Sequence, residues 1–135
     1  MKGIWALAIA VFLLTPLVSR AAATSTQETP QAQARRLAAE YGVPFYLLDY
    51  IITNETHWKP HAVGDMDITC KRTGKPVRAR GIMQLTECWY SHVPDACAFD
   101  TECALRVALP LIAKKHTCMS QWTTCRRYYS TLALK

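Results

Sequence analysis

The chain has 135 residues, with 16 Lys and Arg against 10 Asp and Glu. This length fits one domain, and the sequence contains no repeats and no sign of a second domain. The positive charge suits an anionic polymer such as a cell wall, but no basic segment interleaved with aromatic residues accompanies it, so we expect no nucleic-acid partner.

Residues 1–23 have the three-part layout of a secretory signal peptide. Lys2 gives a positive start, residues 4–18 are nearly all apolar, and the small residues 21–23 fit a cleavage site. The apolar run is shorter than the roughly 20 residues of a spanning helix, so we expect cleavage and no stable membrane insertion. Without Lys2 and Arg20 the mature chain keeps 14 basic and 10 acidic side chains, a net charge of +4. We therefore expect an exported protein, periplasmic or secreted.

All six cysteines lie after residue 69. In a short exported chain an even number of cysteines indicates disulfides. Six cysteines allow fifteen pairings, and we exclude only one. Cys118 and Cys125 on one continuous helix would lie about 10 Å apart, which is too far to bond. A zinc site with the four histidines is the alternative. No CxxC or HExxH pattern is present, and Pro60 interrupts His57 to His61, so we expect no metal and no cofactor.

The first half of the mature chain reads as two helices and a loop. We assign residues 24–33 to a mobile lead-in and 34–135 to the domain, with strong helix formers over 31–41 that stop at Gly42. Pro44 opens a second helix, which contains 47–55 and is closed by Pro60. Residues 65–80 lack helical periodicity and carry five basic side chains, which predicts a loop or short hairpin held through Cys70.

The second half is predicted to be helical as well. A short helix ends near His92, and Asp100 is a suitable N-cap for the next helix, which contains Pro110. A last helix is expected over 120–132. The fold class is therefore mainly α, with about five short helices, because nearly every periodic segment has the helical period.

Glu55 stands at the end of an apolar stripe. It lies seven residues after Leu48, four after Ile51 and three after Ile52, so in a helix it shares their buried face. Carboxylates are rarely buried without a partner, so this one needs a structural or chemical explanation. Pairing with Arg78 or Arg80 is the structural explanation. Asn54-Glu55-Thr56 is also an N-glycosylation sequon, and a glycan there would obstruct a catalytic acid.

Three segments then follow in a recognisable order. They are Asn54-Glu55-Thr56 followed by Pro60 and Ala62-Val63, then Gly81-Ile82-Met83-Gln84, and finally Tyr129-Ser130. This order resembles the lysozyme-like lytic transglycosylase family, related to goose lysozyme, over most of the mature chain. The family has Ser where this chain has Thr56 and Tyr-Asn where it has Tyr129-Ser130, and Tyr128 is an equally good match for that tyrosine. The gap between Glu55 and Gly81 is longer than usual in the family.

The resemblance implies a small lysozyme-like helical domain that cleaves peptidoglycan between N-acetylmuramic acid and N-acetylglucosamine, leaving a 1,6-anhydro end. Glu55 is the implied catalytic residue. The implied substrate-binding residues are Thr56, Met83, Gln84, Tyr129 and Ser130. The chain also resembles the small specialised enzymes that open the wall for secretion, conjugation or pilus systems. Components of such a system would then be its partners. A general acid must be protonated near neutral pH, so we expect a raised pKa for Glu55.

Three alternatives remain open at this point. A hydrolytic muramidase would need a second carboxylate, for which Asp65, Asp67 and Glu87 are available but lie in loops. A non-catalytic peptidoglycan-binding or assembly protein would use the same fold. A cysteine-rich secreted effector acting on a host protein would not bind the wall.

Overall fold

The computed structural model describes residues 27–134, so the predicted signal peptide at 1–23 lies outside the described residues. Six helices and one small antiparallel sheet make up this part of the chain, which confirms the mainly α prediction. Three disulfides join all six cysteines. Within residues 27–134, no helix has both the length and the apolar content needed to cross a bilayer.

Helix α1 (Pro30–Glu40) begins where its cap is made, because the Thr29 hydroxyl accepts a hydrogen bond of 3.2 Å from the Ala32 N–H. The helix therefore starts inside the segment 24–33 that we expected to be a mobile lead-in. Gly42 follows it with φ of +66°, the left-handed conformation expected of a residue after a helix end.

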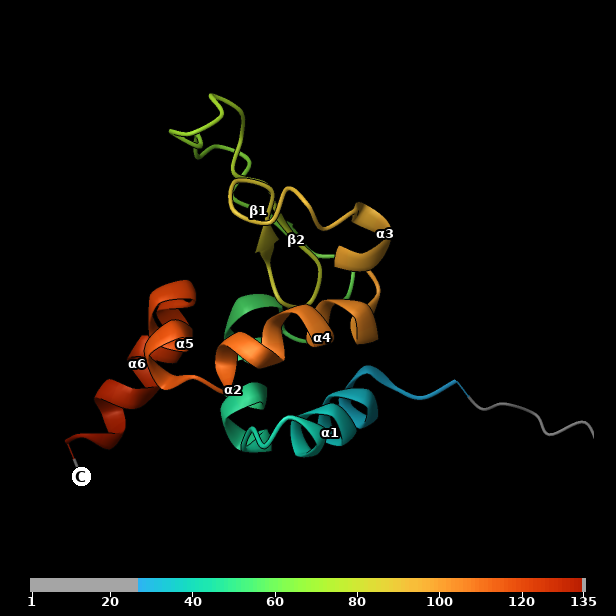
Figure 1. Cartoon of the computed structure of the whole chain (residues 1–135), viewed down its shortest axis with the longest axis vertical. Helices are drawn as coiled ribbons and strands as arrows, with labels where there is room; N and C mark the ends of the chain where they lie inside the picture. The colour runs from blue at the N-terminus through green and yellow to red at the C-terminus, as the bar shows by residue number, and fades with distance from the viewer. Residues whose placement is uncertain (1–26, 135) are drawn as a thin grey trace, which may run out of the picture.

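Helix α2 (Phe45–Thr56) carries the predicted apolar stripe. Leu48, Ile51 and Ile52 are all fully buried. The helix packs against α1 and also against α6 (Thr123–Leu132), while α1 packs against α4 (Thr101–Ile112) (Figure 1). Each fully buried Leu or Ile contributes about 1.5–3 kcal/mol through the hydrophobic effect. The largest fully buried side chains of this core are Leu37, Leu47, Leu48, Ile51, Ile52, Ile82, Met83, Leu85, Leu105, Leu109 and Ile112.

The sheet has the order β1 (Val63–Gly64), β2 (Ala79–Arg80), β3 (Leu85–Thr86), and both pairings are antiparallel. The loop between β1 and β2 projects away from the helices (Figure 1). The Cys70–Cys88 disulfide ties this loop to the segment after β3. We predicted a loop or a short hairpin held through Cys70, and the structure has the short hairpin. We call residues 63–95 the hairpin region.

The helix expected to end near His92 is absent, because residues 87–93 form turns and bends. Two backbone carbonyl groups of this segment accept hydrogen bonds from a buried arginine. The guanidinium of Arg80 donates to the carbonyl oxygens of Tyr90 and Val93, at 3.0 and 2.9 Å, and this segment wraps around it. Helix α3 (Asp95–Ala98) then follows, and the Asp100 carboxylate caps α4 by accepting from the Cys103 N–H at 2.8 Å, as predicted.

The exclusion of a Cys118–Cys125 disulfide was wrong. The single helix expected over 120–132 is two helices, α5 (Lys115–Gln121) and α6, separated by Trp122 in an extended conformation with φ of −121° and ψ of 121°. This break redirects the chain, so the Cα atoms of the two cysteines are 5.9 Å apart and the disulfide forms. Cys97–Cys103 similarly joins α3 to α4.

Candidate functional site

Glu55 lies half-buried in the last turn of α2, where α6 packs against that helix. Its Oε1 accepts a hydrogen bond of 2.7 Å from the hydroxyl of Thr124, a residue that is only 7% exposed. The carboxylate is therefore held from α6, and not by Arg78 or Arg80. Those two arginines lie in the hairpin region and form their ion pairs there.

The backbone turns sharply after the acid. His57 and Trp58 both have a positive φ, at 51° and 63°. Residues other than glycine rarely adopt this backbone conformation. The Trp58 indole N–H lies 3.2 Å from the Asp49 carboxylate and 3.1 Å from the Thr53 hydroxyl, and these contacts fix the turn. Such conformations cluster at functional sites, where the surrounding structure holds them in place.

Thr56 connects the end of α2 to the predicted 81–84 motif. Its hydroxyl lies 3.2 Å from the carbonyl oxygens of both Ile52 and Ile82, and the residue is 5% exposed. The hydroxyl that we expected to bind substrate is thus used inside the protein. It holds residues 81–84 close to Glu55.

The 81–84 segment is a tight turn. Gly81 has φ of +69°, and a Cβ there would lie 1.8 Å from the Ala98 carbonyl oxygen, so only glycine fits. The Met83 side chain is fully buried. The Gln84 side chain donates through Nε2 to the Gly81 carbonyl at 2.9 Å and to the Ala62 carbonyl at 3.4 Å. Of the two predicted substrate ligands in this turn, only Gln84 is partly exposed.

The junction between α5 and α6 (residues 121–124) contributes three hydrogen bonds to this region. Gln121 accepts from the Tyr90 hydroxyl at 2.9 Å, and the Trp122 indole N–H donates to the Met83 carbonyl at 3.0 Å. The third is the bond from Thr124 to Glu55. The junction therefore brings together the segment after β3, the 81–84 turn and the acid. Burial raises the pKa of Tyr90 above the usual value for tyrosine.

Sequence reasoning did not identify Thr124. Its partner lies 69 residues earlier in the chain, so no local spacing connects them. The available signal was the Thr123-Thr124 pair, because two β-branched residues in succession are unfavourable inside a helix and are suited to a helix start.

The predicted residues at the end of the chain lie apart from this cluster. The Ser130 hydroxyl is exposed and donates to the Arg126 carbonyl of its own helix at 2.9 Å. The Lys115 ammonium lies 4.6 Å from the centre of the Tyr129 ring. Tyr128 is the tyrosine that contacts α2, with ring centres 6.1 Å from Tyr46 and 5.4 Å from Tyr50. Burial is the main cause that raises the pKa of Tyr128, and Tyr46 adds to it.

The candidate second carboxylates are elsewhere. Asp65 and Asp67 are exposed in the projecting loop, and Glu87 is paired with Arg78. In the part of the chain that the structure describes, no three His, Cys, Asp or Glu side chains are grouped so that they would hold a metal ion. The chemistry available at this site is that of one half-buried carboxylate with a hydroxyl donor.

Comparisons of the chain with family models, with curated proteins and with solved structures found no match in any of the three.

Proposed function

We propose that this chain is a peptidoglycan lytic transglycosylase with a lysozyme-like fold. One observation carries the proposal. Thr56, which follows Glu55 in the chain, donates to the Ile82 carbonyl and so joins the end of α2 to the Gly81–Gln84 turn, although 24 residues lie between them. Thr124 holds the Glu55 carboxylate beside this junction. The resemblance to lysozyme-like enzymes implies that Glu55, at the end of α2, and the Gly81–Gln84 turn lie close together.

Glu55 has a suitable geometry for a general acid. One carboxylate oxygen, Oε1, accepts from Thr124, while Oε2 has no hydrogen-bond partner among residues 27–134. An oxygen without a protein partner is available to a substrate oxygen, and the hydrogen bond at Oε1 limits rotation of the carboxyl group. A positioned acid of this kind typically contributes about 10²- to 10⁴-fold to a rate.

The proposed reaction proceeds in two steps. Glu55 protonates the oxygen that links the two sugars as the bond from that oxygen to muramyl C1 breaks, and the substrate's own acetamido oxygen bonds to C1. The C6 oxygen then bonds to C1 as the bond from the acetamido oxygen to C1 breaks, and the Glu55 carboxylate takes the proton of the C6 hydroxyl. No water is consumed, Glu55 ends as it began, and one carboxylate suffices, as in substrate-assisted glycosidases.

The test is digestion of purified peptidoglycan with product analysis by mass spectrometry. We expect 1,6-anhydro muropeptides from the wild-type protein, and Glu55→Gln should reduce their release by about 10²- to 10⁴-fold. Reducing ends in place of anhydro ends would identify a hydrolytic muramidase. Binding to the wall with no release would identify a non-catalytic binding protein. Unchanged activity in Glu55→Gln would refute the mechanism.

Asp67→Asn is the matched control for that variant. It also removes one carboxylate charge, but from an exposed position in the projecting loop. We expect its activity to equal that of the wild type, because the proposed mechanism uses a single carboxylate.

The role beside an envelope-spanning secretion, conjugation or pilus system stays a prediction, and a periplasmic or secreted location is proposed with it. The three disulfides are typical of an oxidising compartment.

A further inference from the structure

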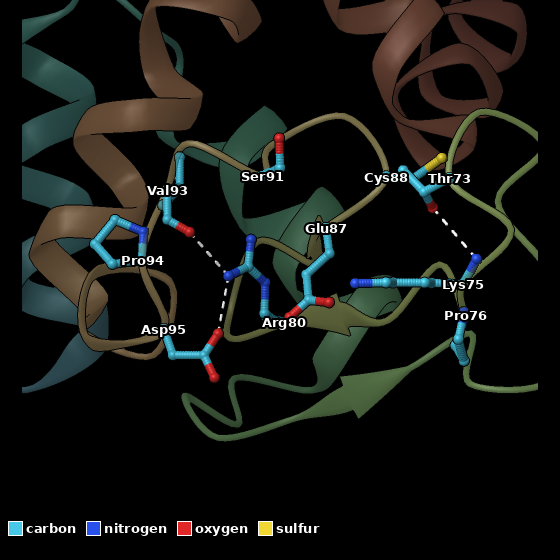
Figure 2. A pocket seen from close by; sticks show the side chains of 10 residues that line it. All are labelled: Thr73, Lys75, Pro76, Arg80, Glu87, Cys88, Ser91, Val93, Pro94 and Asp95. Atoms are coloured by element: carbon cyan, nitrogen blue, oxygen red, sulfur yellow. Dashed lines mark hydrogen bonds and ion pairs between the residues drawn. The ribbon is translucent and has the colours of Figure 1, made fainter.

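A pocket of about 360 Å³ lies in the hairpin region, between the projecting loop and the segment after β3. Figure 2 shows its lining. Lys75 enters from the loop, Glu87 and Asp95 come from the other side, and the buried Arg80 lies between them. This volume is at the lower end of the roughly 300–1,000 Å³ of small-molecule sites, so a fitting occupant is small.

Most charges around the pocket are already paired. Arg80 is 2% exposed, and it donates to three backbone carbonyls and to Asp95. Glu87 is bound by Arg78, which also binds Asp95. The arginines and the carboxylates therefore neutralise one another.

Lys75 is the exception. Its side chain extends into the pocket in the direction of Glu87 (Figure 2), yet its ammonium has no ion pair or hydrogen bond with any residue in the described range 27–134. An unpaired ammonium at the mouth of a small pocket attracts a single negative charge. Because the other charges of the pocket neutralise one another, this one positive charge matches a carboxylate better than a doubly charged phosphate.

The walls suit a peptide. Pro76, Val93 and Pro94 supply apolar surface. Cys88 lines the same pocket, and its disulfide to Cys70 joins the segment after β3 to the projecting loop. Apolar walls with few polar groups are typical of small-ligand sites, and a disulfide keeps such a pocket preformed.

Two hydrogen bonds at the α5–α6 junction connect one wall of the pocket to the proposed catalytic region. The segment 87–95 that forms one wall includes Tyr90, whose hydroxyl donates to Gln121 at the α5–α6 junction. Three residues further along, Thr124 binds Glu55.

We propose that this pocket binds a carboxylate of a short peptide, with Lys75 as the recognising cation. The inference rests on the proposed function, under which the peptide is the branch that peptidoglycan carries on its glycan strands. The protein then recognises peptide-bearing strands in preference to bare glycan.

The test compares peptide-bearing glycan strands with strands stripped of peptide by an amidase. We expect the wild type to have a lower KM for peptide-bearing strands. Lys75→Gln should raise that KM about fivefold, the range of a partly exposed ion pair, and leave the KM for stripped strands unchanged. Lys71→Gln is the matched control, because Lys71 is an exposed lysine of the same loop that does not line the pocket. Equal KM values for both substrates, unaffected by Lys75→Gln, would overturn the pocket and leave the proposed function standing.

A binding experiment separates the two proposals if no strand is cleaved. The peptide released by the amidase, and the same peptide with its carboxylates converted to amides, are titrated into the ¹⁵N-labelled full-length protein. We expect the free acid to shift the backbone amide signals of residues 73–75 and of residues 87–95 other than Pro94. Neither the amide form of the peptide nor the Lys75→Gln variant should give these shifts. Equal shifts from both peptide forms, or no shifts, would refute the carboxylate site. Inorganic phosphate that competes as well as the peptide would show a general anion site and would also refute it.

Discussion

The helical part of the molecule and the hairpin region keep their shapes by different means. Helices α1, α2 and α4 bury a continuous set of apolar side chains. The hairpin region has strands of only two residues each. Ile82, Met83 and Leu85 join the apolar core, and the rest of the region is held by a buried arginine, ion pairs and the Cys70–Cys88 disulfide. An apolar core loses stability gradually as side chains change, whereas a buried polar network depends on every member being satisfied.

The largest expected effect follows from Arg80 in the hairpin region. Arg80→Ala leaves the carbonyl oxygens of Leu85, Tyr90 and Val93 without their donor. Leaving such buried groups unsatisfied should lower the free energy of unfolding by about 4 kcal/mol. Arg80→Lys should recover only part of this loss, because an ammonium cannot reproduce the planar fork of the guanidinium. Chemical denaturation followed by circular dichroism measures both variants.

The control is Arg127→Ala, which removes an exposed arginine of α6. We expect it to change the unfolding free energy by no more than about 0.5 kcal/mol. A loss of less than about 1 kcal/mol in Arg80→Ala, within the range of an ordinary surface change, would show that the hairpin region does not depend on this network.

The second prediction concerns the contact between Thr124 and Glu55. Thr124→Val keeps the shape of the side chain and removes the hydroxyl that holds the carboxylate. We expect a loss of about 1 kcal/mol in stability. If Glu55 is the catalytic acid, kcat should fall about 10- to 100-fold with KM unchanged, because the acid loses its fixed orientation.

A second variant at position 124 distinguishes the loss of the hydrogen bond to Glu55 from a change in side-chain packing. Thr124→Ser restores the hydroxyl and lacks only a methyl group, so it should recover most of kcat while Thr124→Val does not. The ¹³C shift of the Glu55 carboxyl group should change in Thr124→Val and return in Thr124→Ser, whether or not the protein cleaves peptidoglycan. Equal kcat values in Thr124→Val and the wild type would show that this hydrogen bond has no catalytic role.

Local patterns predicted the helical part well. The period of Leu48, Ile51 and Ile52 predicted the buried face of α2, and Asp100 and Gly42 marked a helix start and a helix end. Each of these signals acts over a few residues, because helix periodicity and capping are local effects.

The remaining features depend on contacts between distant residues. Arg80 binds carbonyls of a segment that has no regular structure, so no periodicity reports its role. The break at Trp122 made the Cys118–Cys125 disulfide possible, and that break depends on the indole reaching Met83, 39 residues earlier. Thr124 belongs to the same junction. The sequence therefore predicted the position of Glu55, but not the residue that donates a hydrogen bond to it.

The smallest expected effect is a difference in pH response between the two parts. Hydrogen bonds from Arg78, and then from Arg80, lower the pKa of Asp95 from its usual 3.8 to about 2. A carboxyl group with a lowered pKa stabilises the fold above its unfolded-state pKa, and this contribution is lost as the pH falls from about 4 toward 2. The midpoint of thermal unfolding should therefore fall less steeply over this interval in Asp95→Asn than in the wild type.

Glu102 on α4 is the matched carboxylate of the helical part. Hydrogen bonds from Arg106 and Arg36 lower its pKa, but all three side chains are about two-fifths exposed. Solvent weakens such ion pairs. The Asp95 side chain is also half-exposed, but one of its two partners, Arg80, is only 3% exposed. Glu102→Gln should therefore alter the acid dependence less than Asp95→Asn. The reverse order, measured by scanning calorimetry at pH 5, 4, 3 and 2, would place the acid-sensitive ion pairs in the helical part and contradict the contrast between the two regions.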